Sequence, residues 1–405
     1  MFKKFFLLLI TFILFCGSIT FAEETHFLRK NWYDKAITQL PKHKVTSISL
    51  ICDEGEPSDY DFTWNLDNKG LKGFIINETD VVIHFPDGDK LKTDSFADGL
   101  FSFCHFVKNK DYETGDNGEI IRGVRAEDHM YDDDYYAEYK SSLAYIENLG
   151  LLDTSSATNM EGMFYGDTKL ENIDVSYFNT RLATNMRKMF YKCESLTTLD
   201  LSVFDTSSVT DMSYMFGSCI NLKKIDMSYF NTSEVTNMRR MFYGCKSLHT
   251  INLSKFDTSN VEEMDEMFAH CSNLQILDLK NFKADCLKSA QRMFDDCYNL
   301  IFVNLSSFNS KVLGDASFMF RACKSIEGLD LSSVDMTYAD ISYIFVLDEK
   351  LKYININDSF AKKLGSSKLE GVWRHITTGQ IYNGADYNNI EKTAFPAGVY
   401  EKIAN

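Results

Sequence analysis

Six cysteines recur at a constant interval of 26 residues and are the first candidates for chemistry. They are Cys193, Cys219, Cys245, Cys271, Cys297 and Cys323. Cysteine thiolates bind zinc, but no C-x-x-C or H-x-x-x-H spacing occurs in the chain. Equivalent residues of stacked strands lie about 4.8 Å apart with parallel Cβ vectors, whereas a disulfide needs Cα atoms about 5.5 Å apart and converging side chains. We therefore expect a structural core ladder of buried free thiols that holds no metal.

Methionines repeat with the same period and form M-x-x-M pairs. The pairs are Met186/Met189, Met212/Met215, Met238/Met241 and Met264/Met267. Thioethers are ligands for Cu(I), which makes a copper site one interpretation. Flexible methionines also fill gaps in apolar cores, and a pair that recurs in every repeat favours this second interpretation. We predict core methionines and no cofactor.

A third periodic set consists of aspartates and asparagines at the outward position of a short strand. The set contains Asp174, Asp200, Asp226, Asn252, Asp278, Asn304 and Asp330. Carboxylates about 4.8 Å apart could recruit cations or a basic partner. Alternating Asp and Asn would also let neighbours share hydrogen bonds and dilute their repulsion. We predict that this column is the binding face.

No spacing in the chain indicates a catalytic site. The eight histidines are scattered, and His249 and His270 fall at variable positions of the repeat. The acidic stretch around Asp116 lacks the ligand spacing of a calcium-binding loop. The net charge of −16 disfavours nucleic-acid phosphates, because that binding releases counterions from phosphates paired with Lys and Arg. We therefore predict no catalytic residues, no cofactor and no nucleic-acid partner.

The elements that position these residues follow from the repeat itself. Leu196-x-x-Leu199-x-Leu201 recurs along the chain, and a period in the twenties with this leucine spacing indicates a leucine-rich-repeat solenoid. Alternation places Leu199 and Leu201 inward and Asp200 outward in a short strand. Residues 213–219 resemble a helical turn that buries the Met-Phe pair. The expected fold is a right-handed coil of short parallel strands with short helical or 3-10 turns.

The chain divides into five predicted segments. Residues 1–22 are a signal peptide with Lys3 and Lys4 before an apolar run, cleaved near Ala22. The run is too short to span a bilayer, so we expect a secreted or cell-surface protein with no transmembrane helix in the mature chain. Residues 23–106 form a β-rich N-terminal cap. The sequence leaves open whether Cys52 and Cys104 form a disulfide in it. Residues 107–142 are an acidic insertion, 143–357 the solenoid and 358–405 a small β C-terminal cap.

The repeats resemble those of a known group of bacterial surface proteins. The units at residues 204–216 (FDTSSVTDMSYMF) and 256–268 (FDTSNVEEMDEMF) are similar to the 26-residue repeat of the BspA-like leucine-rich-repeat proteins. The segments at residues 44–50 and 371–373 resemble the flanking parts of that family. The resemblance implies an exported or surface-displayed protein that takes part in adhesion, and it carries over no catalytic residues.

Three functions are consistent with the sequence. The favoured one is a secreted or surface-displayed, non-catalytic protein that mediates adhesion to host or other-cell macromolecules by binding an extracellular protein or glycan. The second is an exported hydrolase or wall-modifying enzyme with its site in residues 26–150 and a targeting solenoid. The third is a structural surface-layer protein.

Overall fold

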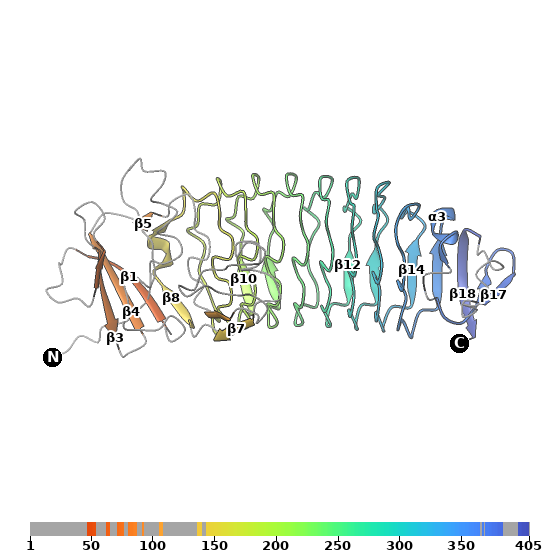
Figure 1. The fold of residues 1–405 in the computed structure, drawn as a ribbon, viewed down its shortest axis with the longest axis horizontal. Coiled ribbons are helices and arrows are strands. Elements are labelled where there is room, and N and C mark those ends of the chain that lie inside the picture. Colours follow the sequence, from red (N-terminus) through yellow and green to blue (C-terminus); the bar gives the residue numbers. More distant parts are fainter. Residues whose placement is uncertain are drawn as a thin grey trace, which may run out of the picture.

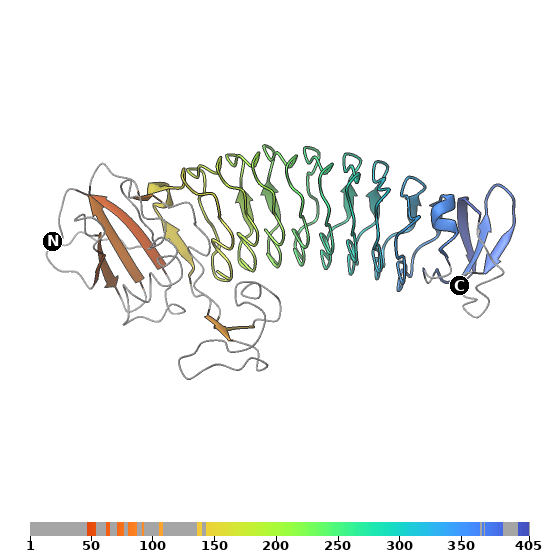
Figure 2. The ribbon, with the colours of Figure 1, turned by 45° about the horizontal axis from the view of Figure 1, so that its top comes forward.

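The protein is elongated, with a β-sheet at each end of a long stack of chain turns (Figures 1 and 2). The computed structural model describes residues 143–364, 367, 369–383 and 396–404, together with the backbone of seven strands between residues 47 and 139. The predicted signal peptide, nearly all of the acidic insertion and the side chains of Cys52 and Cys104 lie outside the described residues.

The N-terminal strands lead directly into the repeats. They are β1 (Ser47–Asp53), β2 (Phe62–Trp64), β3 (Leu71–Ile76), β4 (Asp80–Pro86), β5 (Leu91–Lys92), β6 (His105–Val107), β7 (Tyr136–Tyr139), β8 (Tyr145–Glu147) and β9 (Leu152–Asp153), with the 3-10 helix η2 (Leu149–Leu151) before β9. One sheet has the order β2-β3-β4-β1-β8. Because β8 pairs in parallel with β1, the first turn of the stack extends this sheet.

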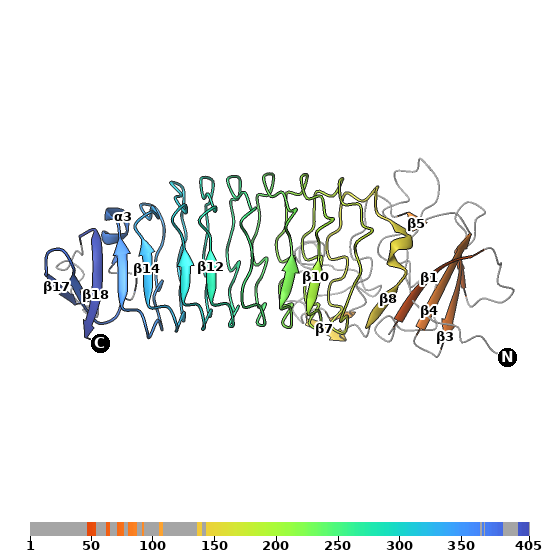
Figure 3. The same ribbon diagram turned by 180° about the vertical axis from the view of Figure 1, so that it is seen from behind.

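Short parallel strands repeat along the stack. They are β10 (Thr198–Asp200), β11 (Lys224–Asp226), β12 (Ile276–Asp278), β13 (Phe302–Asn304), β14 (Gly328–Leu331) and β15 (Tyr353–Ile356). Thr198 pairs with Lys224 and Ile276 with Phe302, so each paired residue lies one sequence period along the chain. Figure 3 shows these strands side by side along one face of the molecule. We use the word coil for one such 26-residue turn of the chain.

A second ladder of backbone contacts runs through the Met-Phe segments, and it differs from the expected helical turn. The N–H groups of Met212, Tyr214 and Phe216 donate to carbonyls of the next coil at 2.8 to 3.1 Å. Tyr214 has a φ of 59° and Ser218 a φ of 57°, both left-handed. An α-helical turn would direct these N–H groups back along its own axis. Here alternate residues direct them to the neighbouring coil, so the segment is a non-helical turn.

The core consists of side chains stacked on their own copies. Phe164, Phe190, Phe216, Phe242, Phe268, Phe294 and Phe320 form one ladder with ring centroids 5.2 to 5.9 Å apart and nearly parallel planes. Offset stacking of this kind is favourable for aromatic rings beyond the area it buries. The core is therefore one continuous column of ladders along the stack.

Buried threonines tie neighbouring coils together at one corner. The Thr232 hydroxyl donates to the Asp257 carbonyl and accepts from the Asp257 N–H, both at 2.8 Å. Thr206 makes the same two bonds to Asn231. In each coil the hydroxyl satisfies one backbone N–H and one backbone C=O that do not take part in strand pairing. A polar side chain can therefore be buried at this corner.

The C-terminal strands close the stack by extending its last sheet. The helix α3 (Asp358–Ala361) is followed by β16 (Val372–His375), β17 (Ile381–Asn383) and β18 (Gly398–Ala404). The sheet order is β14-β15-β18-β16-β17, with β18 antiparallel to β15. The cap therefore pairs the exposed edge of the last coil, as stacked repeats require.

At the coarse level, the prediction of short parallel strands is confirmed, and the described residues contain almost no helix. The predicted domain boundaries stay predictions. No helix in the described part of the chain has the length and apolar character needed to cross a membrane.

Candidate binding surface on the strand face

The outward positions of the strands form two adjacent columns. The Asp/Asn column is the predicted one, and it continues to Asn355 in β15. The other, which we name the apolar column, lies two residues earlier in each coil and contains Ile276, Phe302 and Tyr353. Together they make up the strand face.

The members of the Asp/Asn column from Asp174 to Asp330 each close a turn in their own coil. The Oδ1 atom of Asp200 accepts the Ser202 N–H at 2.9 Å, and that of Asp226 accepts the Ser228 N–H at 3.0 Å. Asp174, Asn252, Asp278, Asn304 and Asp330 make the same bond two residues on, at 2.9 to 3.2 Å. This Asx turn suits Asp and Asn equally. The column therefore has a structural role, whether or not it also binds a partner.

Hydrogen bonds also link members of the column in neighbouring coils. The Asn304 amide donates to the Asp278 carboxylate at 2.9 Å, and the Asn355 amide donates to Asp330 at 3.1 Å. Hydrogen bonds from the hydroxyl and the N–H of Ser202 hold the pKa of the Asp200 carboxyl below its usual range. That aspartate is therefore ionised at neutral pH and presents negative charge on the strand face.

The apolar column exposes large side chains where a polar surface would be expected. Ile276 is 54% exposed, and Phe302 and Tyr353 are each 50% exposed. Gly328 lies between Phe302 and Tyr353, and a Cβ placed there would meet nothing nearer than Tyr353 Cβ at 3.7 Å. No side chain therefore stands between Phe302 and Tyr353 in this column. Earlier coils carry Thr198, Lys224 and Thr250 in this column, so the apolar part is confined to the C-terminal half.

Paired charges surround the apolar column. Lys280 contacts Asp278 at 2.8 Å, Lys352 contacts Glu327 at 3.0 Å, and Arg374 contacts Glu401 at 2.5 Å. Glu401 is the cross-strand neighbour of both Tyr353 and Arg374 in the sheet. The Arg374–Glu401 ion pair therefore lies next to Tyr353, at the C-terminal end of the apolar column. An apolar centre with a polar rim is the usual anatomy of a protein interface.

The six ladder cysteines are free, fully buried thiols. Each Sγ lies 3.0 to 3.2 Å from the carbonyl oxygen of a phenylalanine in the preceding coil, to which the thiol donates. Burial raises the pKa of Cys219 and of Cys271 to about 12. A thiol that stays protonated and has no access to solvent is neither a nucleophile nor a metal ligand.

The methionine pairs, for which a copper site was one interpretation, belong to the core. The paired methionines are fully buried beside the phenylalanine ladder. Within the described ranges, no three His, Cys, Asp or Glu side chains come together as a metal site. Cys286, which lies off the ladder, is exposed.

Our sequence reasoning missed the apolar column. The alternation that placed Asp278 and Asn304 outward also places Ile276 and Phe302 outward, two residues earlier. The detectable signal was the change from Thr198 and Lys224 to Ile276 and Phe302 at one repeat position. A hydrophobic residue at an outward strand position is easily taken for part of the core when only the leucine spacing is followed.

In comparisons with known proteins, the repeat region matches a family of unknown function. Residues 134–226 and 218–333 match the family model described as "Mycoplasma protein of unknown function, DUF285". This match is consistent with the resemblance to BspA-like repeat proteins. No curated protein matches the chain. Across its repeats, the chain is thus similar to a family whose description records no activity.

Proposed function

We propose that the protein is a BspA-like leucine-rich-repeat solenoid, secreted or displayed at the cell surface, that binds an extracellular protein or glycan without catalysis. The binding region is the C-terminal half of the strand face. The observation that carries the proposal is the exposed apolar column of Ile276, Phe302 and Tyr353, which is framed by paired charges and the Asp/Asn column.

The extent of this surface supports a macromolecular partner. A half-exposed aromatic side chain leaves on the order of 100 Å² open to a partner. Ile301, Ile376, Ile381 and Val399 are also 39 to 59% exposed on or beside the same sheets. Together with the column they approach roughly 600 Å², against about 800 Å² per partner in a standard interface. The polar rim would supply the remainder.

A binding screen with matched variants tests the proposal. The chain from residue 23 onward is applied to arrays of matrix proteins and of glycans, and compared with the double variant Phe302→Ser, Tyr353→Ser. We expect the double variant to weaken binding at least about tenfold. Tyr229→Ser is the matched control, because Tyr229 is 73% exposed and lies off the two columns. Equal binding by all three proteins would refute the proposed surface.

The charge of the Asp/Asn column needs a variant that spares the Asx turn. Asp226→Asn with Asp278→Asn removes two charges and keeps an Oδ1 acceptor in each coil. A basic partner would bind this variant more weakly and with less salt dependence, while a neutral glycan would not distinguish it from the unchanged protein. Recovery of the bound ligand with unchanged mass tests the absence of catalysis. Surface labelling of intact cells tests the location.

A further inference from the structure

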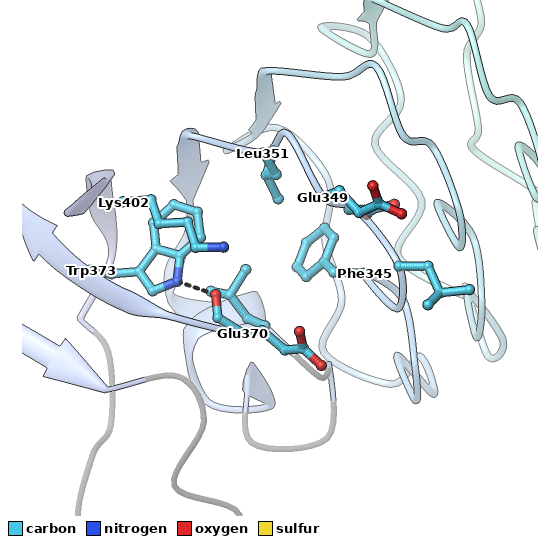
Figure 4. Close-up of a pocket in the computed structure, with 9 residues that line it drawn as sticks. Phe345, Glu349, Leu351, Glu370, Trp373 and Lys402 are labelled. Atoms are coloured by element: carbon cyan, nitrogen blue, oxygen red, sulfur yellow. Dashed lines mark hydrogen bonds between the residues drawn. The ribbon is translucent and has the colours of Figure 1, made fainter. Parts of the chain in front are cut away.

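A pocket of about 280 Å³ lies between the last coil and the C-terminal strands (Figure 4). Its apolar lining consists of Phe345, Leu351, Leu369 and Trp373, which are almost completely buried, and of Leu347, which is 54% exposed. The volume is at the lower limit of pockets that hold drug-sized ligands, so it suits a smaller molecule. The pocket is separate from the strand face and does not depend on the function proposed above.

A lysine on the inner face of β18 reaches into this pocket. Side chains alternate along a strand, and Tyr400, two residues before Lys402, is fully buried in the core. Lys402 pairs across the sheet with Trp373, and Figure 4 shows its ammonium directed toward Phe345. A Cβ at Gly371, where φ is +99°, would lie 2.3 Å from Lys402 Cε. The glycine therefore leaves room for the side chain of Lys402, which lines the pocket.

A carboxylate of opposite charge stands at the pocket rim. Glu370 lines the pocket, and its backbone carbonyl accepts the Trp373 indole N–H at 3.1 Å, which holds this segment against the wall. Neither Lys402 nor Glu370 forms an ion pair with any residue that the structure describes. By contrast, Glu349 at the same rim is paired with Lys324 at 2.9 Å. The pocket thus presents one unpaired cation and one unpaired anion beside an apolar wall.

Asp348 adds a polar group to the lining of the pocket. It occupies the position of the ladder cysteines in the last coil, 25 residues after Cys323, and its Oδ1 accepts the Cys323 N–H at 2.9 Å. Its Oδ2 is buried with no hydrogen-bond partner. The six coils from Cys193 to Cys323 have a thiol at this position, whereas the last coil has a carboxyl group, as does the first coil at Asp167.

We propose that this pocket binds a free amino acid with an apolar side chain. The α-carboxylate pairs with Lys402, the α-ammonium pairs with Glu370, and the side chain lies against Phe345, Leu351, Leu369 and Trp373. A zwitterion matches both unpaired charges at once, whereas a simple fatty acid or amine would leave one of them unpaired. Such complementarity gives specificity more than raw affinity.

Calorimetry with the chain from residue 23 onward tests this site. L-leucine and L-phenylalanine are compared with leucinamide, which lacks the carboxylate, and with 4-methylpentanoate, which lacks the ammonium. We expect at least one amino acid to bind and each analogue to bind about tenfold more weakly or worse. The dipeptide leucyl-leucine separates a free amino acid from a peptide. Binding of the dipeptide alone, or equal binding of the analogues, would overturn the proposal.

Two variants assign the charges. Lys402→Met should weaken leucine binding at least about tenfold and abolish the preference for leucine over leucinamide. Glu370→Gln should abolish the preference for leucine over 4-methylpentanoate. Lys362→Met, an exposed lysine outside this pocket, is the matched control. Thermal unfolding confirms that each variant is folded. Failure of both amino acids to produce heat or raise the melting temperature would also overturn the site, and leaves the strand-face function untouched.

Discussion

Asp348 shows how a single residue differs when its coil has no further repeat beside it. Burial raises the pKa of its carboxyl well above the usual value, because the charged form loses its hydration. A residue with a raised folded-state pKa favours folding while it is protonated. Its ionisation destabilises the folded state progressively as the pH rises from the unfolded-state pKa through the folded-state pKa.

Asp348→Asn should therefore stabilise the protein at pH 8 and have little effect at pH 4. The amide keeps an oxygen for the Cys323 N–H and carries no charge to desolvate. We expect a gain on the order of 1–3 kcal/mol at pH 8 in urea unfolding. An equal gain at the two pH values would show that ionisation of Asp348 is not the cause.

The cysteine ladder makes a separate prediction about reactivity. Iodoacetamide applied to the folded chain, followed by peptide mapping, should modify Cys286 and spare the six ladder cysteines, because Cys286 alone among these is exposed. Urea should make the ladder cysteines reactive. Modification of Cys245 or Cys271 in the folded protein at the rate of Cys286 would contradict their burial.

At the scale of the elements, the buried threonines contribute to the stability of the stack through hydrogen bonds between neighbouring coils. Thr232→Val should destabilise the protein by about 2 kcal/mol, because it leaves the N–H and C=O groups of Asp257 without partners. Thr232→Ser keeps the hydroxyl and is the matched control. Chemical denaturation of the two variants measures the difference, and equal stability would show that water replaces the hydroxyl.

The elements also show which parts of the fold the sequence can predict. The alternation around Leu199 and Leu201 predicts which side chains of the strand point inward and which point outward. Asp and Asn at fixed positions of the repeat predict the turns. The Met-x-x-Met-Phe spacing suggested a helical turn, but Lys188, Tyr214 and their equivalents have left-handed φ values. These residue types do not favour that conformation on their own. It is stabilised by hydrogen bonds to the next coil, which local sequence does not reveal.

At the scale of the whole molecule, the stack should tolerate the loss of one whole coil. Deleting residues 207–232 removes one full period and lets equivalent residues pair again. We expect a folded protein with an unchanged circular dichroism spectrum per residue and a length shorter by about 4.8 Å in X-ray scattering. Deleting residues 207–219 should abolish cooperative unfolding, because it shifts every later side chain out of its ladder. Similar stability of both deletions would contradict the stacking.

The candidate site was predictable only in part at this scale. The Asp/Asn column was visible in the sequence because it recurs in every coil, and the structure assigns the same residues to Asx turns. The apolar column appears only from Ile276 onward, so a search for what every repeat shares passes over it. The amino-acid pocket depends on Lys402, Glu370 and Phe345, which the last coil and the cap bring together from separate segments.

Hydrogen–deuterium exchange tests the proposed binding surface most directly. Exchange is measured by mass spectrometry on the chain alone and on the chain saturated with the partner found in the binding screen. Our account predicts slower exchange confined to peptides that contain strands from β12 to β18, with β10 and the Met-Phe turns unchanged. Protection centred on the Met-Phe turns or on the N-terminal sheet, with β12 to β18 unaffected, would contradict binding through the strand face.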